Sequence, residues 1–279
     1  ETYKYELRRV PRSETEQVRG FIEGLIGRVL PPGMYEVVPC GSYRRGKPGS
    51  GDLDFLILGN YDLSDPTLCK GADQDGESCD VHKCVELLQV LVNELKREGR
   101  VKPLVNAGNQ HIWKSLNSRH RGFQNGGIFP AAATFMGLVL PPGGEYWRRL
   151  DLWFHPRQHR PFAMMTYTGS AHFNRSMRLF CKRKGFSLNS YGVYKRDVTE
   201  VTAGSSDYSE TPWHVGLVEG AWECEEEEDV FRLLGVKYVP PRERDGGIPI
   251  ENWKAVKADV SGEDSEEEEE EFDDEDGGG

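Results

Sequence analysis

Two aspartates separated by one residue, Asp52 and Asp54, are the first feature of this sequence that could do chemistry. They open the segment Asp52 to Leu58, which is otherwise apolar and is predicted to form a strand. Because side chains alternate along a strand, both carboxylates point to one face, opposite Leu53 and Phe55. Carboxylates held that close repel each other unless a hard divalent cation lies between them. The spacing therefore predicts a metal site that suits Mg²⁺ when phosphate completes its shell.

A turn-rich basic segment, Gly41 to Gly51, precedes this pair. Its Gly-Ser turn offers backbone N–H groups and a hydroxyl to phosphate oxygens, and Arg44, Arg45 and Lys47 add positive charge there. An Asp-x-Asp pair after a glycine loop is by itself more often a turn cap or a solvated strand end. Together with the turn and its basic residues, it is typical of a nucleotidyltransferase.

A third oxygen ligand follows farther along the chain. Asp151 is the only acid in the otherwise apolar segment Leu150 to Trp153, and a lone buried carboxylate is costly unless it is paired or bound to a metal. An ion pair with Arg149 would also explain it. Because the neighbouring strand carries Asp52 and Asp54, we expect a cluster of three aspartates, as two-metal catalysis requires.

The surrounding elements are read from hydrophobic periodicity and turn residues. Ser13 to Glu16 has the form of a capping box at the start of a helix that Pro31 ends. The other predicted elements are strands at 35–40, 52–58, 134–140 and 149–154, and helices at 81–97 and 170–184, with the last two strands paired across the turn at 141–144. This order predicts an α+β sheet domain followed by a smaller domain.

The charge of −11 is concentrated at one end. Residues 263–276 hold twelve acids and no Lys or Arg, so the rest of the chain is near −11 + 12 = +1. A second acidic run, Glu223 and Glu225 to Asp229, holds six more acids, so the remainder is near +7, and such a basic body is compatible with a polyanion partner. No apolar run approaches the ~20 residues that span a bilayer, so we expect no membrane partner. The chain begins with Glu1 and its first segment lacks the apolar run of a signal peptide, so we expect a piece of a longer protein.

The cysteines, six in number, show no paired spacing, which indicates a reducing compartment. Cys69, Cys79, His82 and Cys84 superficially suggest a zinc site. However, the last two open a predicted helix, and no second Cys-x-x-Cys follows. We therefore prefer to interpret these cysteines as residues of surface loops.

Several long motifs in order resemble the family X DNA polymerases, from about Arg8 to Asp245. They are Gly41 to Lys47, Gly51 to Asp54, Arg149 to Asp151, and Thr168 to Arg178. The resemblance implies a nucleotidyltransferase palm, a mixed sheet with helices on one face, at residues 13–160, and a small α+β thumb at 161–246. Residues 1–12 would end an upstream fingers region, and 247–279 would be an extension, acidic and disordered from about 262.

The resemblance also implies the activity and the role of each site residue. The enzyme would add deoxynucleotides to a primer 3′-hydroxyl on primer-template or gapped DNA, with Mg²⁺ as cofactor and Mn²⁺ as a substitute. Asp52 and Asp54 would hold both ions, and Asp151 would hold the catalytic ion and help to deprotonate the primer hydroxyl. Triphosphate contacts fall on Arg9, Ser42, Arg45, Ser50 and Gly51, sugar contacts on Tyr167, Thr168 and Gly169, base-pair and template contacts on Asn174 and Arg178, and a further DNA contact on Arg149.

The same resemblance implies a nuclear protein of short-gap excision repair or end joining, recruited to repair proteins through upstream regions. Those regions would also carry the lyase and the 5′-phosphate grip of the family. Two alternatives are a template-independent terminal nucleotidyltransferase and a silent scaffold that binds DNA ends, although the three intact aspartates argue against the scaffold.

The sequence departs from the family pattern near the expected sugar site. Thr166-Tyr167 stands where the family usually has Tyr-Phe, so the resemblance does not settle how ribonucleotides are excluded. Trp153 and Ser190 replace charged residues of some members, so no charge switch operates between them. The segment Asn106–Ala133 lies where template-tolerant members carry a long loop, which predicts either tolerance of broken templates or a lineage-specific insert.

Overall fold

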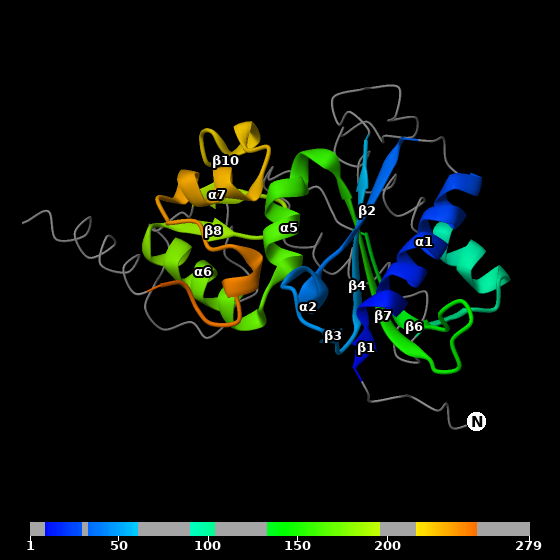
Figure 1. Cartoon of the computed structure of the whole chain (residues 1–279). Helices are drawn as coiled ribbons and strands as arrows, with labels where there is room; N and C mark the ends of the chain where they lie inside the picture. Colours follow the sequence, from blue (N-terminus) through cyan, green and yellow to red (C-terminus); the bar gives the residue numbers. More distant parts are fainter. Residues whose placement is uncertain (1–8, 30–32, 61–89, 104–132, 196–215, 250–279) are drawn as a thin grey trace, which may run out of the picture.

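A computed structural model describes residues 9–29, 33–60, 90–103, 133–195 and 216–249 of the chain. The described elements gather into two bodies, a palm built on a sheet and a smaller thumb region, with helix α5 (Arg160–Thr168) between them (Figure 1). This arrangement confirms the predicted α+β class, a mixed sheet with helices followed by a second region.

The palm sheet has five strands in the order β2-β4-β7-β6-β5. Their bounds are β2 Tyr35–Pro39, β4 Leu53–Gly59, β7 Arg148–Pro156, β6 Ala133–Val139 and β5 Val101–Pro103. The central pair β4 and β7 is parallel, whereas every other neighbouring pair is antiparallel, so the sheet is mixed. The predicted hairpin across residues 141–144 is confirmed as the antiparallel pair β6 and β7.

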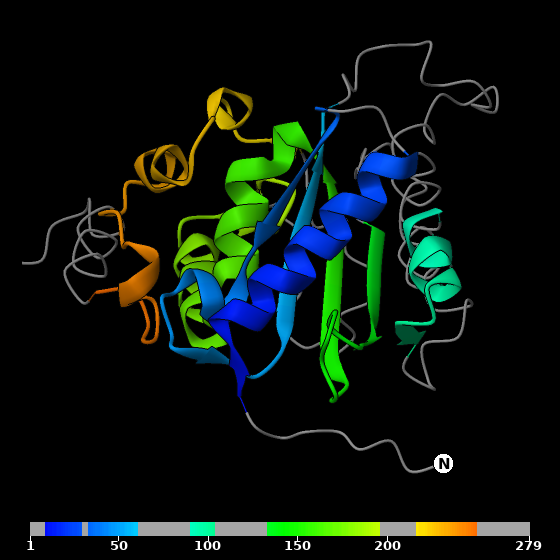
Figure 2. The ribbon, with the colours of Figure 1, turned by 45° about the vertical axis from the view of Figure 1, so that its right-hand side comes forward.

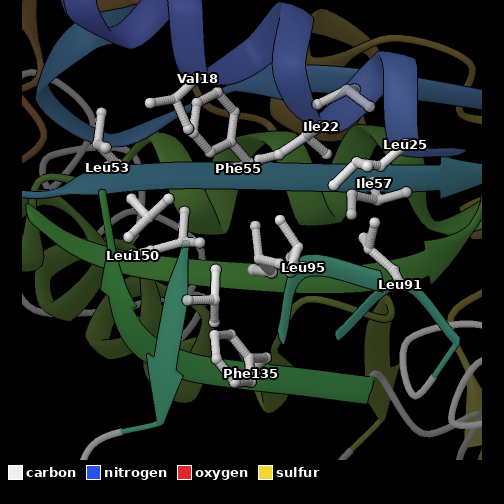
Figure 3. Close-up of a cluster of buried hydrophobic side chains, with 14 of the residues drawn as sticks. Val18, Ile22, Leu25, Leu53, Phe55, Ile57, Leu91, Leu95, Phe135 and Leu150 are labelled. Atoms are coloured by element: carbon white, nitrogen blue, oxygen red, sulfur yellow. The ribbon is translucent and has the colours of Figure 1, made fainter. Parts of the chain in front are cut away.

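The palm core lies between this sheet and two helical segments on one of its faces (Figure 2). These segments are α1 (Arg12–Val29) and residues 90–97, the described part of the helix predicted at 81–97. Figure 3 shows Val18 and Ile22 of α1 directed at Phe55 and Leu53 of β4. Each large side chain buried in this way stabilises the fold by about 1.5–3 kcal/mol, which holds β4 firmly against α1.

The thumb region has its own core and its own small sheet. Helix α6 (Ala171–Arg183) is capped by Ser170, whose hydroxyl accepts a hydrogen bond from the Phe173 N–H at 3.2 Å. Strands β8 (Phe186–Leu188), β9 (Val193–Lys195) and β10 (Gly216–Leu217) form an antiparallel sheet, and α7 (Glu227–Leu234) packs beside it. Short 3-10 turns complete the described chain at η2 Arg157–His159, η3 Ala221–Glu223 and η4 Pro241–Glu243.

The structure differs from the sequence prediction in three segments of the chain. Helix α1 begins at Arg12, so Ser13 lies in its first turn and not at the predicted N-cap. The segment predicted as a loop contains a short helix, α2 (Gly41–Arg44), and strand β3 (Gly49–Ser50), which pairs with β1 (Val10–Pro11). Helix α5 was not predicted, because it is buried on nearly every side and shows no polar stripe.

Some predictions fall on residues outside the described ranges. These are the zinc alternative at Cys69 to Cys84, nearly all of the segment Asn106–Ala133, and the acidic segment from about 262. Among the described helices, none has the length and the apolar character needed to cross a membrane.

Candidate active site

Three aspartates converge at one end of the parallel strand pair. Carboxylate oxygens of Asp52, Asp54 and Asp151 all lie within 4.8 Å of one another. Asp54 of β4 and Asp151 of β7 are direct Cα partners in the parallel register, and Asp52 lies just before β4 begins. The predicted three-aspartate cluster is therefore present, and the sheet itself sets two of its members side by side.

The electrostatics of this cluster favour a bound cation. Burial, and then the neighbouring Asp151 carboxylate, raise the pKa of Asp54 to about 7, and burial also raises the pKa of Asp151. Arg149 forms an ion pair with Asp52 and lies 3.7 Å from an Asp151 carboxylate oxygen. The ion pair considered as an alternative for Asp151 thus exists together with the cluster. Arg149 serves two of the carboxylates and Arg45 acts on Asp54 from a distance, so the three carboxylates remain short of positive charge.

The donor set suits a hard divalent ion such as Mg²⁺, which prefers carboxylate oxygens and phosphate.

A glycine in the preceding turn makes the arrangement of the three aspartates possible. Gly41 has φ +53°, and a Cβ placed on it would lie 1.8 Å from the Asp54 Oδ2 atom. Only glycine fits at this position, because the turn passes directly over a carboxylate of the cluster.

The phosphate turn, residues 41–51, lies against this cluster. The Ser42 hydroxyl is buried and has no hydrogen-bond partner among the described residues. A buried hydroxyl without a partner is costly, and a phosphate oxygen would satisfy it. Ser50 is buried in β3, where Arg9 donates a hydrogen bond to the Gly49 carbonyl oxygen at 3.1 Å. The exposed Gly51 then leads into Asp52.

Two neighbouring arginines of this turn reach the end of α5. Arg44 donates to the Thr168 hydroxyl at 2.6 Å, and Arg45 donates to the Thr168 carbonyl oxygen at 2.5 Å. Arg45 and Lys47 also pair with the carboxylate of Asp245. Because Thr168 is completely buried, the phosphate turn and the start of the thumb region are held together at this residue.

The sequence predicts that Arg44 adds positive charge for phosphate, but the contacts that the structure describes for this residue are with α5 and α7. Its guanidinium instead pairs with Glu227 of α7, which also binds Arg244 at 2.6 Å. Arg244 is fully buried and Glu227 nearly so. The two ion pairs offset the cost of burying the Glu227 carboxylate away from water. Arg44 therefore joins the palm to the thumb.

The remaining predicted residues lie at the junction with the thumb. Tyr167 and Gly169 flank Thr168 at the end of α5. Asn174 donates from its side-chain amide to the Thr166 carbonyl oxygen at 2.6 Å, so it contacts the end of α5. Arg178 is exposed on α6 and makes no hydrogen bond or ion pair with the described part of the chain.

Comparison with known families decides what this site belongs to. The family model of the DNA polymerase beta palm matches residues 9–157, and that of the DNA polymerase beta thumb matches residues 163–245. The chain belongs to the family X DNA polymerases. The aspartate cluster lies within the palm match, and α5 joins the palm match to the thumb match.

Individual family X proteins are similar to this chain over most of its length. DNA polymerase lambda of Rattus norvegicus is 30% identical over 86% of the chain, and DNA-directed DNA/RNA polymerase mu of Homo sapiens is 28% identical over 84%. The chain spans 33% and 41% of their lengths. A crystal structure of Leishmania infantum polymerase beta in a ternary gap complex shares the fold, with a TM-score of 0.57 and 23% identity over 85% of this chain and 71% of that one.

Sequence reasoning about this family X chain missed a buried polar group beside the site. His155 and His159 are both fully buried, and His155 lies 2.9 Å from the Tyr167 hydroxyl. The one signal that could have found His155 is its place in the strand. It is a lone histidine in an apolar run, and alternation puts it on the same face as Asp151.

Proposed function

We propose that this chain is the catalytic part of a DNA-directed DNA polymerase that adds deoxynucleotides to a primer 3′-hydroxyl. The observation that carries this proposal is the cluster of Asp52, Asp54 and Asp151 beside a phosphate turn with an unsatisfied buried hydroxyl. Nucleotide addition is an in-line displacement at phosphorus, which is accelerated mainly by positioning and by charge stabilisation. This site offers both.

The cluster would hold two Mg²⁺ ions, or Mn²⁺ in their place. Asp52 and Asp54 would contact both ions and Asp151 the catalytic one. Bound there, the metal would supply positive charge to the triphosphate and lower the pKa of the primer hydroxyl. By this proposal the Asp151 carboxylate has a second task, which is to accept the proton that this hydroxyl loses.

The rest of the site would hold and orient the substrates. Ser42 and Arg45 present a hydroxyl and a guanidinium on the phosphate turn, which suits a triphosphate. Exposed Arg178 on α6 suits DNA, because its charge is not used within the described chain. By this proposal the triphosphate contacts are Arg9, Ser42, Arg45, Ser50 and Gly51, the sugar contacts Tyr167, Thr168 and Gly169, and the DNA contacts Asn174, Arg178 and Arg149.

The proposed setting is short-gap repair in the nucleus, by excision repair or end joining. Two observations support it: one relative is a DNA polymerase lambda, and a protein with this fold is known in a ternary gap complex. The natural substrate would then be gapped DNA with a deoxynucleoside triphosphate. Residues 13–160 would act as the palm and 161–246 as the thumb.

The test is extension of a gapped duplex by the full-length protein, with and without Mg²⁺ and with and without a template strand. Asp151→Asn keeps the size of the side chain but removes its charge, so incorporation should be lost while DNA binding is retained. Asp229→Asn, at the start of α7, is the matched control and should extend normally. Extension that needs no template would establish the terminal transferase instead, and DNA binding without incorporation would establish the scaffold.

A further inference from the structure

One face of β7 continues from the aspartate cluster to a buried histidine. Residues 151, 153 and 155 alternate onto the same face of the strand, which is the face covered by α5. Tyr167, near the end of α5, lies against this row. Its ring stacks on Trp153 with the centroids 4.3 Å apart, and its hydroxyl lies 2.9 Å from the His155 Nε2 atom.

The ring of Tyr167 is thus held at two points, one apolar and one polar. His155 is completely buried, and burial followed by the neighbouring His159 places its pKa well below the usual value, so the imidazole is neutral. A hydrogen bond in such a dry place is strong, and loss of the Tyr167 hydroxyl would leave the buried His155 Nε2 atom without this bond. Tyr167 therefore cannot rotate or withdraw without breaking this bond.

This fixed ring lies at the border of the nucleotide site. Trp153, on which it stacks, is two residues from Asp151, roughly 7 Å along the strand. The next residue along α5, Thr168, accepts hydrogen bonds from Arg44 and Arg45 of the phosphate turn. A nucleotide whose phosphates lie between that turn and the aspartates would therefore place its sugar beside Tyr167.

We propose that His155 is a positioning residue for sugar selection, holding the Tyr167 ring as a rigid wall beside the 2′ position of the incoming nucleotide. This inference rests on the proposed polymerase function. A ring that can move aside rejects an added hydroxyl only weakly. The rejection of the ribonucleotide 2′-hydroxyl therefore depends on how rigidly the Tyr167 ring is held in place. The ring would discriminate between ribonucleoside and deoxyribonucleoside triphosphates of the same base.

The test compares kcat/KM for a deoxynucleotide and for the matching ribonucleotide on one gapped duplex, using the full-length protein. His155→Phe and Tyr167→Phe each remove one partner of the bond. Each should lower the preference for the deoxynucleotide between about 2-fold and 10-fold, the factor that one hydrogen bond is worth. The change should appear mainly as a lower KM for the ribonucleotide, and the double variant should add little to either single change.

Two further variants of His155 separate positioning from general damage. The amide nitrogen of Gln in His155→Gln can occupy the place of Nε2 and should restore the preference, whereas the shorter Asn reaches only the place of Nδ1 and should not. Phe154→Leu is the matched control, because Phe154 is equally buried on the same strand but packs into the core on the opposite face. It should lower the melting temperature without changing the preference.

An unchanged preference in Tyr167→Phe, which removes only a hydroxyl, would overturn the inference even if His155→Phe failed to fold. An equal loss of preference in Phe154→Leu would overturn it as well, since strand damage would then explain the effect. A wild-type protein that incorporates neither nucleotide would refute the proposed function itself. That outcome is distinct from active incorporation with an unchanged preference.

Discussion

Replacing Gly41 by alanine tests whether the turn over the aspartate cluster positions the chemistry. An added Cβ would lie 1.8 Å from Asp54 Oδ2, although real Cβ atoms essentially never approach a neighbour closer than 3.0 Å. The turn or the carboxylate must therefore move by at least 3.0 − 1.8 = 1.2 Å. A misplacement of about 1 Å in a catalytic site costs about 100-fold in rate, so we expect kcat to fall by at least that factor.

The same substitution also has a backbone cost that must be separated from the clash. Gly41 has φ +53°, and alanine in this left-handed region loses about 1–2 kcal/mol of stability. Gly143 has φ +72°, and a Cβ added there would meet no atom within 4 Å, so this position carries the backbone cost alone. Gly143→Ala should therefore lower the free energy of unfolding with kcat unchanged.

The assay is Mg²⁺-dependent addition of a single nucleotide to a gapped duplex by the full-length protein, with chemical unfolding measured in parallel. A Gly41→Ala protein that folds and keeps the wild-type kcat would refute the reasoning, because the carboxylate would then tolerate displacement. Equal losses of kcat in Gly41→Ala and Gly143→Ala would refute it in another way, by assigning the effect to the backbone.

Three further predictions concern charge, hydrogen bonding and pH. Glu227→Gln should cost about 3 kcal/mol of unfolding free energy, because it leaves the buried charge of Arg244 without its carboxylate partner; a chemical unfolding midpoint equal to wild type would contradict this. Ser42→Ala should raise the KM for the nucleotide without lowering the melting temperature, because its buried hydroxyl has no partner within the described protein; an unchanged KM would exclude a phosphate contact. Burial lowers the pKa of His159 to about 3 and that of His155 well below its usual value. Both histidines therefore stay neutral in the folded protein, whereas in the unfolded chain they bind protons as the pH falls below about 6.5. The free energy of unfolding should therefore fall from pH 7 to pH 5. In His159→Phe the slope of the free energy of unfolding against pH should be smaller by up to about 1.4 kcal/mol per pH unit. Equal slopes in the variant and the wild type would contradict the prediction.

The four longer strands of the palm, β2, β4, β6 and β7, and the acidic cluster of the site were predictable because both follow from local alternation. Asp52 and Asp54 share one face of a strand, and Asp151 interrupts an apolar run, so their metal-binding character is visible in the sequence. The start of α6, predicted at residue 170, was also predictable locally, since Ser170 acts on the turn that directly follows it.

The features that depend on distant or fully buried partners were not predictable. Arg44 was expected at the phosphates, because nothing near it in the sequence reveals Glu227, 183 residues away. Helix α5 was missed because apolar residues surround it, and a helix without a polar face has no amphipathic period. The bond between His155 and Tyr167 depends on how α5 crosses β7, which no local pattern records.

The parallel register of β4 and β7 has a consequence for how this enzyme can vary. Two of its three clustered carboxylates, those of Asp54 and Asp151, are spaced by the hydrogen-bonding ladder of the main chain, in which neighbouring strands lie about 4.8 Å apart. That gap cannot be widened for a larger ion unless the ladder breaks. Asp52 precedes the ladder, so its position is not fixed by the pairing of these two strands. Loops around the sheet can therefore diverge in sequence and length, while the distance between these two carboxylates stays constant.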